Sequence, residues 1–296
     1  MIDIIDLRFL GFDDAIACFL VETAVGPVLV ETGPHSTLPN IEKSLAQKGY
    51  TLQDVQHVFL THIHLDHAGA AWYFAQHGAT VYLHPFGERH MADPSKLMSS
   101  ASRIYKDQMD SLWGQMNPIE TSQLKTLAHG DKIELGEHTF TAWHTPGHAV
   151  HHIAWQLNED TLFAGDVAGV KILGGMVVPP CPPPDINVED WQASIALIKS
   201  LNIKTMYLTH FGAVTNIEEH LNQLEKNLLS WANWIKPHWE AERSPQDITP
   251  EFQAFTQQQL LDCGVAKENL HKYEAANPSW MSVAGLLRYW RKKSEA

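Results

Sequence analysis

Short apolar runs and amphipathic segments follow one another along most of the chain, which predicts a mixture of strands and helices. Runs rich in β-branched and aromatic residues, bounded by Gly, Asp and Pro turns, predict strands. Apolar residues spaced three and four apart predict helices. The predicted strands are 2–7, 15–22, 28–31, 55–60, 80–84, 133–135, 139–143, 153–157, 161–164 and 205–209. The predicted helices are 38–48, 70–77, 188–200, 217–235, 252–261 and 280–290.

This order of elements divides the chain into a mixed part and a helical tail. We expect an α/β domain over residues 1–212 and a C-terminal helical extension over 213–296. Residues 85–118 are polar and helical in pattern, so we expect a helical insertion between strands that could lean over a site as a lid. The proline-rich run 179–184 predicts an extended loop, because proline fits neither helix nor strand interiors.

Candidate metal ligands lie directly after the predicted strand 55–60. Four of them fall within six residues: His62, His64, Asp66 and His67. Loops at the ends of buried strands commonly carry binding and catalytic groups, and so many polar ligands cannot all face a core. The chain has 18 histidines, but a metal site explains this local cluster better than chance.

Three further candidates also lie beside small residues at turns or strand ends. His148 follows a Thr-Pro-Gly turn, Asp166 follows Phe-Ala-Gly after one strand, and His210 ends another. With the first cluster they supply five imidazoles and two carboxylates. This set is too large for one tetrahedral zinc ion and suits two metal ions that share a carboxylate.

The complete set resembles the metallo-β-lactamase superfamily, particularly its glyoxalase II-like and lactonase-like branches. The family motif HxHxDH is matched by His62, His64, Asp66 and His67, and its downstream ligands are matched by His148, Asp166 and His210. The resemblance covers residues 1 to about 212. It implies a four-layer αββα sandwich of two mixed β-sheets, with the metal ions at one edge, and makes 1–212 the catalytic domain.

The resemblance also implies how the ligands divide between two metal ions. Metal 1 would bind His62, His64 and His148; metal 2 would bind Asp66, His67 and His210; Asp166 would bridge them. Zinc is the expected ion, with iron or manganese as alternatives, because ligand type alone does not identify the metal. In Glu31-Thr32-Gly33 a glutamate stands where the family usually has an aspartate that supports the ligand loop. Whether Glu31 gives the same support is left open by the sequence.

The implied activity is metal-dependent hydrolysis of a small ester, thioester or lactone. A hydroxide bridging two metal ions would attack the carbonyl carbon, since two nearby dications acidify a shared water. Asp66 is the catalytic candidate, because a ligand beside that water could orient it or accept a proton. The alternative is an oxidoreductase, a sulfur dioxygenase of the same superfamily that uses a single iron ion.

Substrate residues are harder to predict from the sequence. Arg89 in the insertion could bind an anionic group, and Met176 after Asp166 could form part of a wall; solvated charge and core packing are the respective alternatives. The aromatic side chains of Tyr105 and Trp113 could line the site, but helix packing explains them equally well.

Net charge and cysteine content limit which kinds of partner and which cellular compartment we expect. The 21 Lys and Arg residues against 34 Asp and Glu residues give a net charge of -13, which disfavours nucleic acid and membrane surfaces and favours a small-molecule substrate. The three cysteines form no paired pattern and the N-terminus lacks a signal-peptide pattern, so we expect a cytoplasmic protein. The helical tail could pack on the core or build a homodimer interface.

Overall fold

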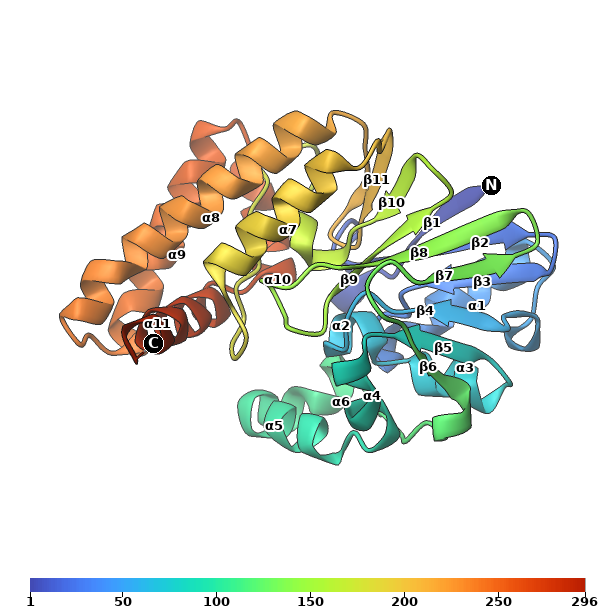
Figure 1. Cartoon of the computed structure of the whole chain (residues 1–296). Coiled ribbons are helices and arrows are strands. Elements are labelled where there is room, and N and C mark those ends of the chain that lie inside the picture. The colour runs from blue at the N-terminus through green and yellow to red at the C-terminus, as the bar shows by residue number, and fades with distance from the viewer. Residues whose placement is uncertain (296) are drawn as a thin grey trace.

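The computed structural model describes residues 1–295 and contains two six-stranded sheets packed face to face, with helices on both outer sides (Figure 1). The strand order is β1-β2-β3-β4-β5-β6 in the first sheet and β12-β11-β10-β9-β8-β7 in the second. Both sheets mix parallel and antiparallel neighbours. The predicted four-layer αββα sandwich is therefore confirmed.

The strands are short and lie mostly where the sequence predicts them. The first sheet contains β1 (Ile2–Asp6), β2 (Ala17–Thr23), β3 (Gly26–Val30), β4 (His57–Phe59), β5 (Thr80–Leu83) and β6 (Leu124–Thr126). The second contains β7 (Lys132–Leu135), β8 (His138–His144), β9 (Ile153–Leu157), β10 (Thr161–Phe163), β11 (Thr205–Leu208) and β12 (Gly212–Val214). The neighbours from β3 to β6, and the pair β10 and β11, run parallel.

The helices fall into an outer layer on each sheet and an insertion between β5 and β6. The first sheet carries α1 (Leu38–Gln47), α2 (Leu65–Ala68) and α3 (Ala71–Gln76), and the insertion contains α4 (Pro85–Ala92), α5 (Ser95–Tyr105) and α6 (Met109–Leu112). The second sheet carries α7 (Val188–Ser200), α8 (Ile217–Glu240), α9 (Pro245–Asp262), α10 (Leu270–Ala276) and α11 (Ser279–Glu295). None of the described helices combines the length and the apolar content needed to cross a bilayer.

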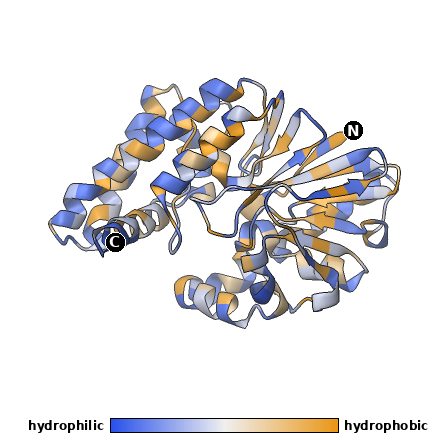
Figure 2. Cartoon of the chain, viewed as in Figure 1, coloured by the Kyte–Doolittle hydropathy of each residue, from blue (hydrophilic) through white to orange (hydrophobic). Residues whose placement is uncertain are grey.

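Alternation along the strands sends neighbouring side chains into different hydrophobic clusters, because successive residues of a strand point to opposite faces. In β2, Ala17, Phe19 and Val21 enter the cluster between the two sheets. Cys18 and Leu20 enter the cluster beneath the helices of the first sheet. Figure 2 shows hydrophobic residues along the strands and more hydrophilic ones on the outer helices. A third cluster lies between the second sheet and its helices, so each layer boundary is apolar.

Two hydrogen bonds join the sheets near the end of β4. The indole nitrogen of Trp155 donates to the carbonyl oxygen of Leu60 at 2.9 Å. The backbone nitrogen of Ile153 donates to the carbonyl oxygen of Thr61 at 2.7 Å. These bonds hold the strand that precedes His62 against the second sheet, and so fix where the ligand loop begins.

The C-terminal helices share their hydrophobic cluster with the second sheet. Leu221 and Leu228 of α8 are buried in the same cluster as Trp191 of α7 and Met206 of β11. Strand β12 also extends that sheet to Val214, slightly beyond the expected boundary at residue 212. The tail therefore packs on the core, while the division at 212 and a homodimer remain predictions.

Packing of α11 against the proline-rich loop can be tested at Gly285. A Cβ atom at this position would lie 2.0 Å from the carbonyl oxygen of Cys181. In an isolated helix alanine is more favourable than glycine by about 1 kcal/mol. We expect Gly285→Ala to lower the free energy of unfolding by about 1–3 kcal/mol instead, because the methyl group overpacks the contact. Urea unfolding with an unchanged or higher midpoint would contradict this packing.

Candidate metal centre

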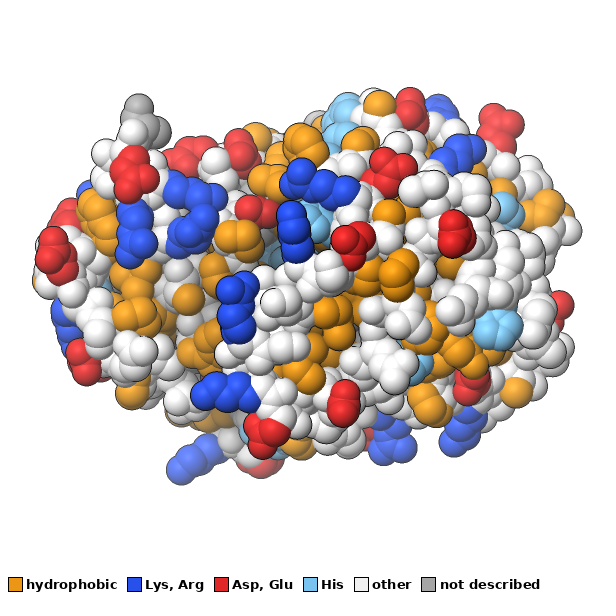
Figure 3. Space-filling view, turned by 90° about the horizontal axis from the view of Figure 1, so that it is seen from below, with side chains coloured by type: hydrophobic (Ala, Val, Ile, Leu, Met, Phe, Trp, Pro, Cys, Tyr) orange, Lys and Arg blue, Asp and Glu red, His pale blue; other side chains and the backbone are white. Residues whose placement is uncertain are grey.

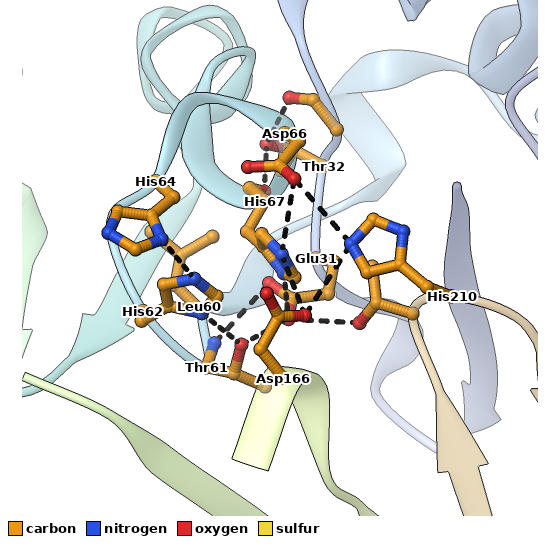
Figure 4. A network of polar contacts seen from close by, with 12 residues as sticks. Glu31, Thr32, Leu60, Thr61, His62, His64, Asp66, His67, Asp166 and His210 are labelled. Atoms are coloured by element: carbon orange, nitrogen blue, oxygen red, sulfur yellow. Dashed lines mark hydrogen bonds and ion pairs between the residues drawn. The ribbon is translucent and has the colours of Figure 1, made fainter. Parts of the chain in front are cut away.

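Polar residues gather at one edge of the sandwich because they follow the carboxyl ends of neighbouring strands. Glu31 follows β3, His62 follows β4, His148 lies beyond β8, Asp166 follows β10 and His210 follows β11. The short helix α2 then places two more ligands beside them. Figure 4 shows the side chains of Glu31, His62, His67, Asp166 and His210 pointing toward one another from different segments.

Three histidine side chains form a first group of candidate ligands. Nδ1 of His64 lies 2.9 Å from Nε2 of His62 and 3.0 Å from Nε2 of His148. The three nitrogen atoms are close enough to bind one ion. This group contains the residues predicted for metal 1.

Asp66, His67 and His210 form a second group. Oδ2 of Asp66 lies 3.5 Å from Nε2 of His210 and 3.7 Å from Nε2 of His67. These atoms also come close enough to hold a single ion. The group contains the residues predicted for metal 2, so the two predicted sets are each brought together.

The Asp166 carboxylate lies between the two groups. Its Oδ2 is 3.3 Å from Nε2 of His148 in the first group. Its Oδ1 is 3.2 Å from Nε2 of His67 and 3.5 Å from Nε2 of His210 in the second. A carboxylate shared by two ions would need this placement, and the bridging role itself remains a prediction.

The donor set fits divalent cations. Nε2 of His67, Nε2 of His210 and Oδ1 of Asp166 are buried without a hydrogen-bond partner. Buried polar atoms nearly always have a partner, so three such atoms facing one another indicate that a ligand belongs between them. Imidazole nitrogen and carboxylate oxygen are the ligands that zinc and similar ions take.

The far nitrogen atoms of two candidate ligands are bonded to backbone carbonyls. Nδ1 of His148 donates to the carbonyl oxygen of Pro180 at 2.8 Å, and Nδ1 of His210 donates to that of Ala15 at 2.7 Å. Such bonds fix the orientation of an imidazole and leave its Nε2 free for a metal ion. The proline-rich loop therefore helps to position His148.

Glu31 performs the corresponding task for His67. Its fully buried carboxylate accepts hydrogen bonds from Nδ1 of His67 at 3.0 Å, from the hydroxyl and backbone nitrogen of Thr61, and from the hydroxyl of Thr209 at 3.5 Å. Although Glu31, His62 and His67 also lie close enough to hold an ion, this carboxylate is already occupied. The glutamate thus supports the ligand loop, a point that the sequence left open.

Burial and charge set opposite protonation tendencies in the two groups. Burial and neighbouring imidazoles lower the pKa of His62 well below its usual value, so its ring stays neutral. Burial would also lower the pKa of His67, but three nearby carboxylates, first that of Asp166, outweigh it and raise this pKa. Neutral imidazoles and ionised carboxylates are the forms that bind metal ions.

Two further histidines lie beside the candidate ligands and differ in their contacts. Nδ1 of His152 lies 2.8 Å from the hydroxyl of Thr145, and its Nε2 accepts from the backbone nitrogen of Val167, so this ring supports the loop. His151 lines the cavity above the ligands, and its buried Nδ1 has no partner. Sequence reasoning did not single out His151; its spacing of three from His148 was the available signal.

The two predicted substrate residues occupy different surroundings. Arg89 lines the same cavity as Asp66, so the structure brings it to the site. Met176 is buried in the hydrophobic cluster beneath the C-terminal helices, and its carbonyl oxygen accepts from the Tyr273 hydroxyl at 3.0 Å. Met176 is not part of the cavity lining, because the chain turns away from the site after Asp166.

A family model described as the metallo-beta-lactamase superfamily matches residues 11–210, which include every candidate ligand. The chain belongs to the metallo-β-lactamase superfamily. One relative, a metallo-beta-lactamase fold-containing protein of Sulfurisphaera tokodaii, is 28% identical over 62% of this chain and 71% of its own length. The thioesterase pkgB of Emericella nidulans is 24% identical over 72% of this chain. This chain spans about half the length of that thioesterase, 52%.

Solved structures share the fold beyond the part matched by the family model. A metallo-beta-lactamase family protein of Thermus thermophilus has a TM-score of 0.69 and 20% identity, covering 99% of this chain and 94% of its own. A subclass B3 metallo-beta-lactamase from a soil metagenome has a TM-score of 0.55 and 18% identity, covering 77% and 91%. The superfamily fold with C-terminal helices therefore has a structural precedent.

The supporting role of Glu31 gives a prediction for metal affinity. Glu31→Gln keeps the side-chain size but removes the charge that faces His67 and Thr61. Since loss of such a support typically weakens metal binding about 10–100-fold, we expect a loss in this range. Competition with a chromophoric chelator measures it without any substrate. Glu22→Gln, a change at a partly exposed residue of β2, is the control, and equal affinities in both variants would contradict the assignment.

Proposed function

We propose that this protein is a binuclear metal-dependent hydrolase of esters, thioesters or lactones. The observation that carries the proposal is the Asp166 carboxylate, which contacts His148 of the first group and His67 and His210 of the second. Two complete ligand groups with one carboxylate between them suit two cations better than one. We propose zinc as the ion in both positions and a cytoplasmic location.

The residues of the site have distinct tasks in this reaction. Two bound cations would acidify a water molecule and polarise the substrate carbonyl. Asp66 faces the cavity, and its side chain keeps 22% of its exposure, so it can orient the attacking water and accept a proton. The water oxygen bonds to the carbonyl carbon, the ester or thioester bond breaks, and the departing oxygen or sulfur takes up a proton.

Relatives support a thioester among the possible bonds. The Emericella nidulans relative is named a thioesterase, and a Pseudocercospora fijiensis relative, 26% identical over 79% of this chain and 61% of its own length, is named an atrochrysone carboxyl ACP thioesterase. These names give a reason to test thioesters first. Proteins of one fold catalyse different reactions, so the substrate panel also includes esters and lactones.

Metal content separates this proposal from the sulfur dioxygenase alternative. We expect about two zinc ions per chain in protein purified without added metal or chelator, because both ligand groups are complete. Elemental mass spectrometry measures this ratio directly. One iron ion per chain, together with oxygen consumption on a persulfide substrate, would favour the dioxygenase instead.

Replacement of the shared carboxylate tests the mechanism. We expect Asp166→Ala to lower kcat/KM for thioester hydrolysis by about 10²–10⁴-fold, because a metal contribution of several kcal/mol is lost. Its metal content should fall as well, while circular dichroism still reports a cooperative unfolding transition. The control is Asp160→Ala, which removes a surface ion pair with Lys204. Undiminished hydrolysis by Asp166→Ala would exclude the binuclear mechanism.

A further inference from the structure

A cavity of about 1020 Å³ lies over the candidate metal ligands. Its floor includes His64, Asp66 and Asp166, and its walls come from α5, α6, the proline-rich loop, α10 and α11. Pockets for small molecules usually measure about 300–1,000 Å³. The space above the site is therefore far larger than an isolated ester or thioester bond needs.

The walls of this cavity are mostly apolar and partly open to solvent. Among residues 1–295, eleven large hydrophobic side chains are exposed, and five of them line this cavity, with exposed fractions from 37% to 58%. These five are Leu10, Phe86, Ile104, Val150 and Trp280. Figure 3 views the molecule from the side of α5 and shows hydrophobic side chains gathered across the middle of this face. Such clustering marks a binding site, because scattered single side chains are the ordinary pattern.

Aromatic side chains join the insertion to the C-terminal helices across this space. The Tyr105 hydroxyl of α5 donates to the sulfur of Met281 in α11 at 3.6 Å. The Tyr105 ring lies 5.1 Å from that of Trp113 and 6.2 Å from that of Trp280. The two segments whose roles the sequence left open therefore bound one apolar space together.

Polar side chains also line the walls, and two of the lining residues have a buried nitrogen atom without a hydrogen-bond partner. Nε1 of Trp113 and Nδ1 of His151 are buried and make no hydrogen bond, although both residues line the cavity. Arg89 and Lys96 bring positive charge to the same lining, and Asp185 and Glu274 bring negative charge. The lining thus combines a reactive floor, an apolar interior and a charged part.

We propose that this cavity binds a long hydrophobic acyl group, whose ester or thioester carbonyl lies at the metal centre. This assignment rests on the proposed hydrolase function. The apolar walls accept the acyl group, while the charged part of the lining suits the more polar alcohol or thiol half. Hydrolysis then yields a hydrophobic carboxylic acid and the free alcohol or thiol.

A series of acyl lengths on one thiol tests the assignment in the metal-loaded protein. Burial of one methylene group changes a binding equilibrium constant about fourfold. Each added methylene should therefore raise kcat/KM by up to this factor. From acetyl to octanoyl we expect a rise of at least about a hundredfold. A matched series with a constant acetyl group and lengthening thiols should show a much weaker dependence.

Paired variants locate the effect in the cavity. Ile104→Asn places a polar group on the wall, and Leu261→Asn makes the same kind of change at an exposed apolar residue outside the lining. We expect the ratio of octanoyl to acetyl kcat/KM to fall about tenfold in the first variant and to stay unchanged in the second. Titration calorimetry with octanoate and butyrate on the same proteins gives a readout that needs no catalysis.

The outcomes separate this assignment from the proposed function. Binding of octanoate well above butyrate, weakened by Ile104→Asn alone, supports the acyl cavity even if no ester or thioester is hydrolysed. Hydrolysis that does not depend on acyl length overturns the acyl cavity and leaves the hydrolase intact. Equal effects of the two Asn variants, or a dependence only on the length of the thiol, also overturn it.

Discussion

The candidate metal centre depends on the hydrogen bonds that the buried Glu31 carboxylate accepts. A charge without exposure is costly unless several donors surround it, and Thr61, His67 and Thr209 supply those donors. They lie after β4, within α2 and after β11, so one carboxylate ties three segments together. Glu31 also has a backbone φ of 66°, a conformation that non-glycine residues seldom adopt. Strain of this kind persists only where the surroundings hold it in place.

The apolar sandwich explains why the ligands lie at an edge. Both faces of the central strands enter hydrophobic clusters, so polar side chains can follow these strands but not interrupt them. Backbone bonds from Ile153 to Thr61 and from Ala17 to Thr209 then close the two sheets against each other beside the site. Ligands that follow four strands, β4, β8, β10 and β11, therefore converge without any single loop defining their geometry.

The elements with strong periodic patterns were predictable from the sequence. The helix predicted over 188–200 has these bounds in α7, and the alternating strand 153–157 is β9. The sequence pattern did not predict β6 and β12, because each has only three residues. Each forms a strand through its hydrogen bonds to the neighbouring strand. The long helix α9 was predicted only in its second half, since Pro250 interrupts the sequence pattern but not the helix.

The candidate site shows the same limit at the level of single residues. The seven ligand candidates could be predicted from residue type, since clusters of histidine and aspartate are visible in the sequence. The carbonyl oxygens of Pro180 and Ala15, which orient His148 and His210, belong to the backbone and leave no such signal. Met176 is near Asp166 in the chain but lies outside the cavity lining, because the segment that follows Asp166 enters the hydrophobic core.

The metal centre and the cavity above it are built from different kinds of structure. The ligands follow strands whose side chains fill three hydrophobic clusters, so a change there disturbs the whole sandwich. The cavity walls include helices and the proline-rich loop, and a contact between Tyr105 and Met281, 176 positions apart in the chain, joins the insertion to the C-terminal helices. Exposed wall residues such as Ile104 can therefore change without disturbing the ligands. In a fold organised in this way, the insertion and the C-terminal helices can change while the candidate metal ligands stay in place.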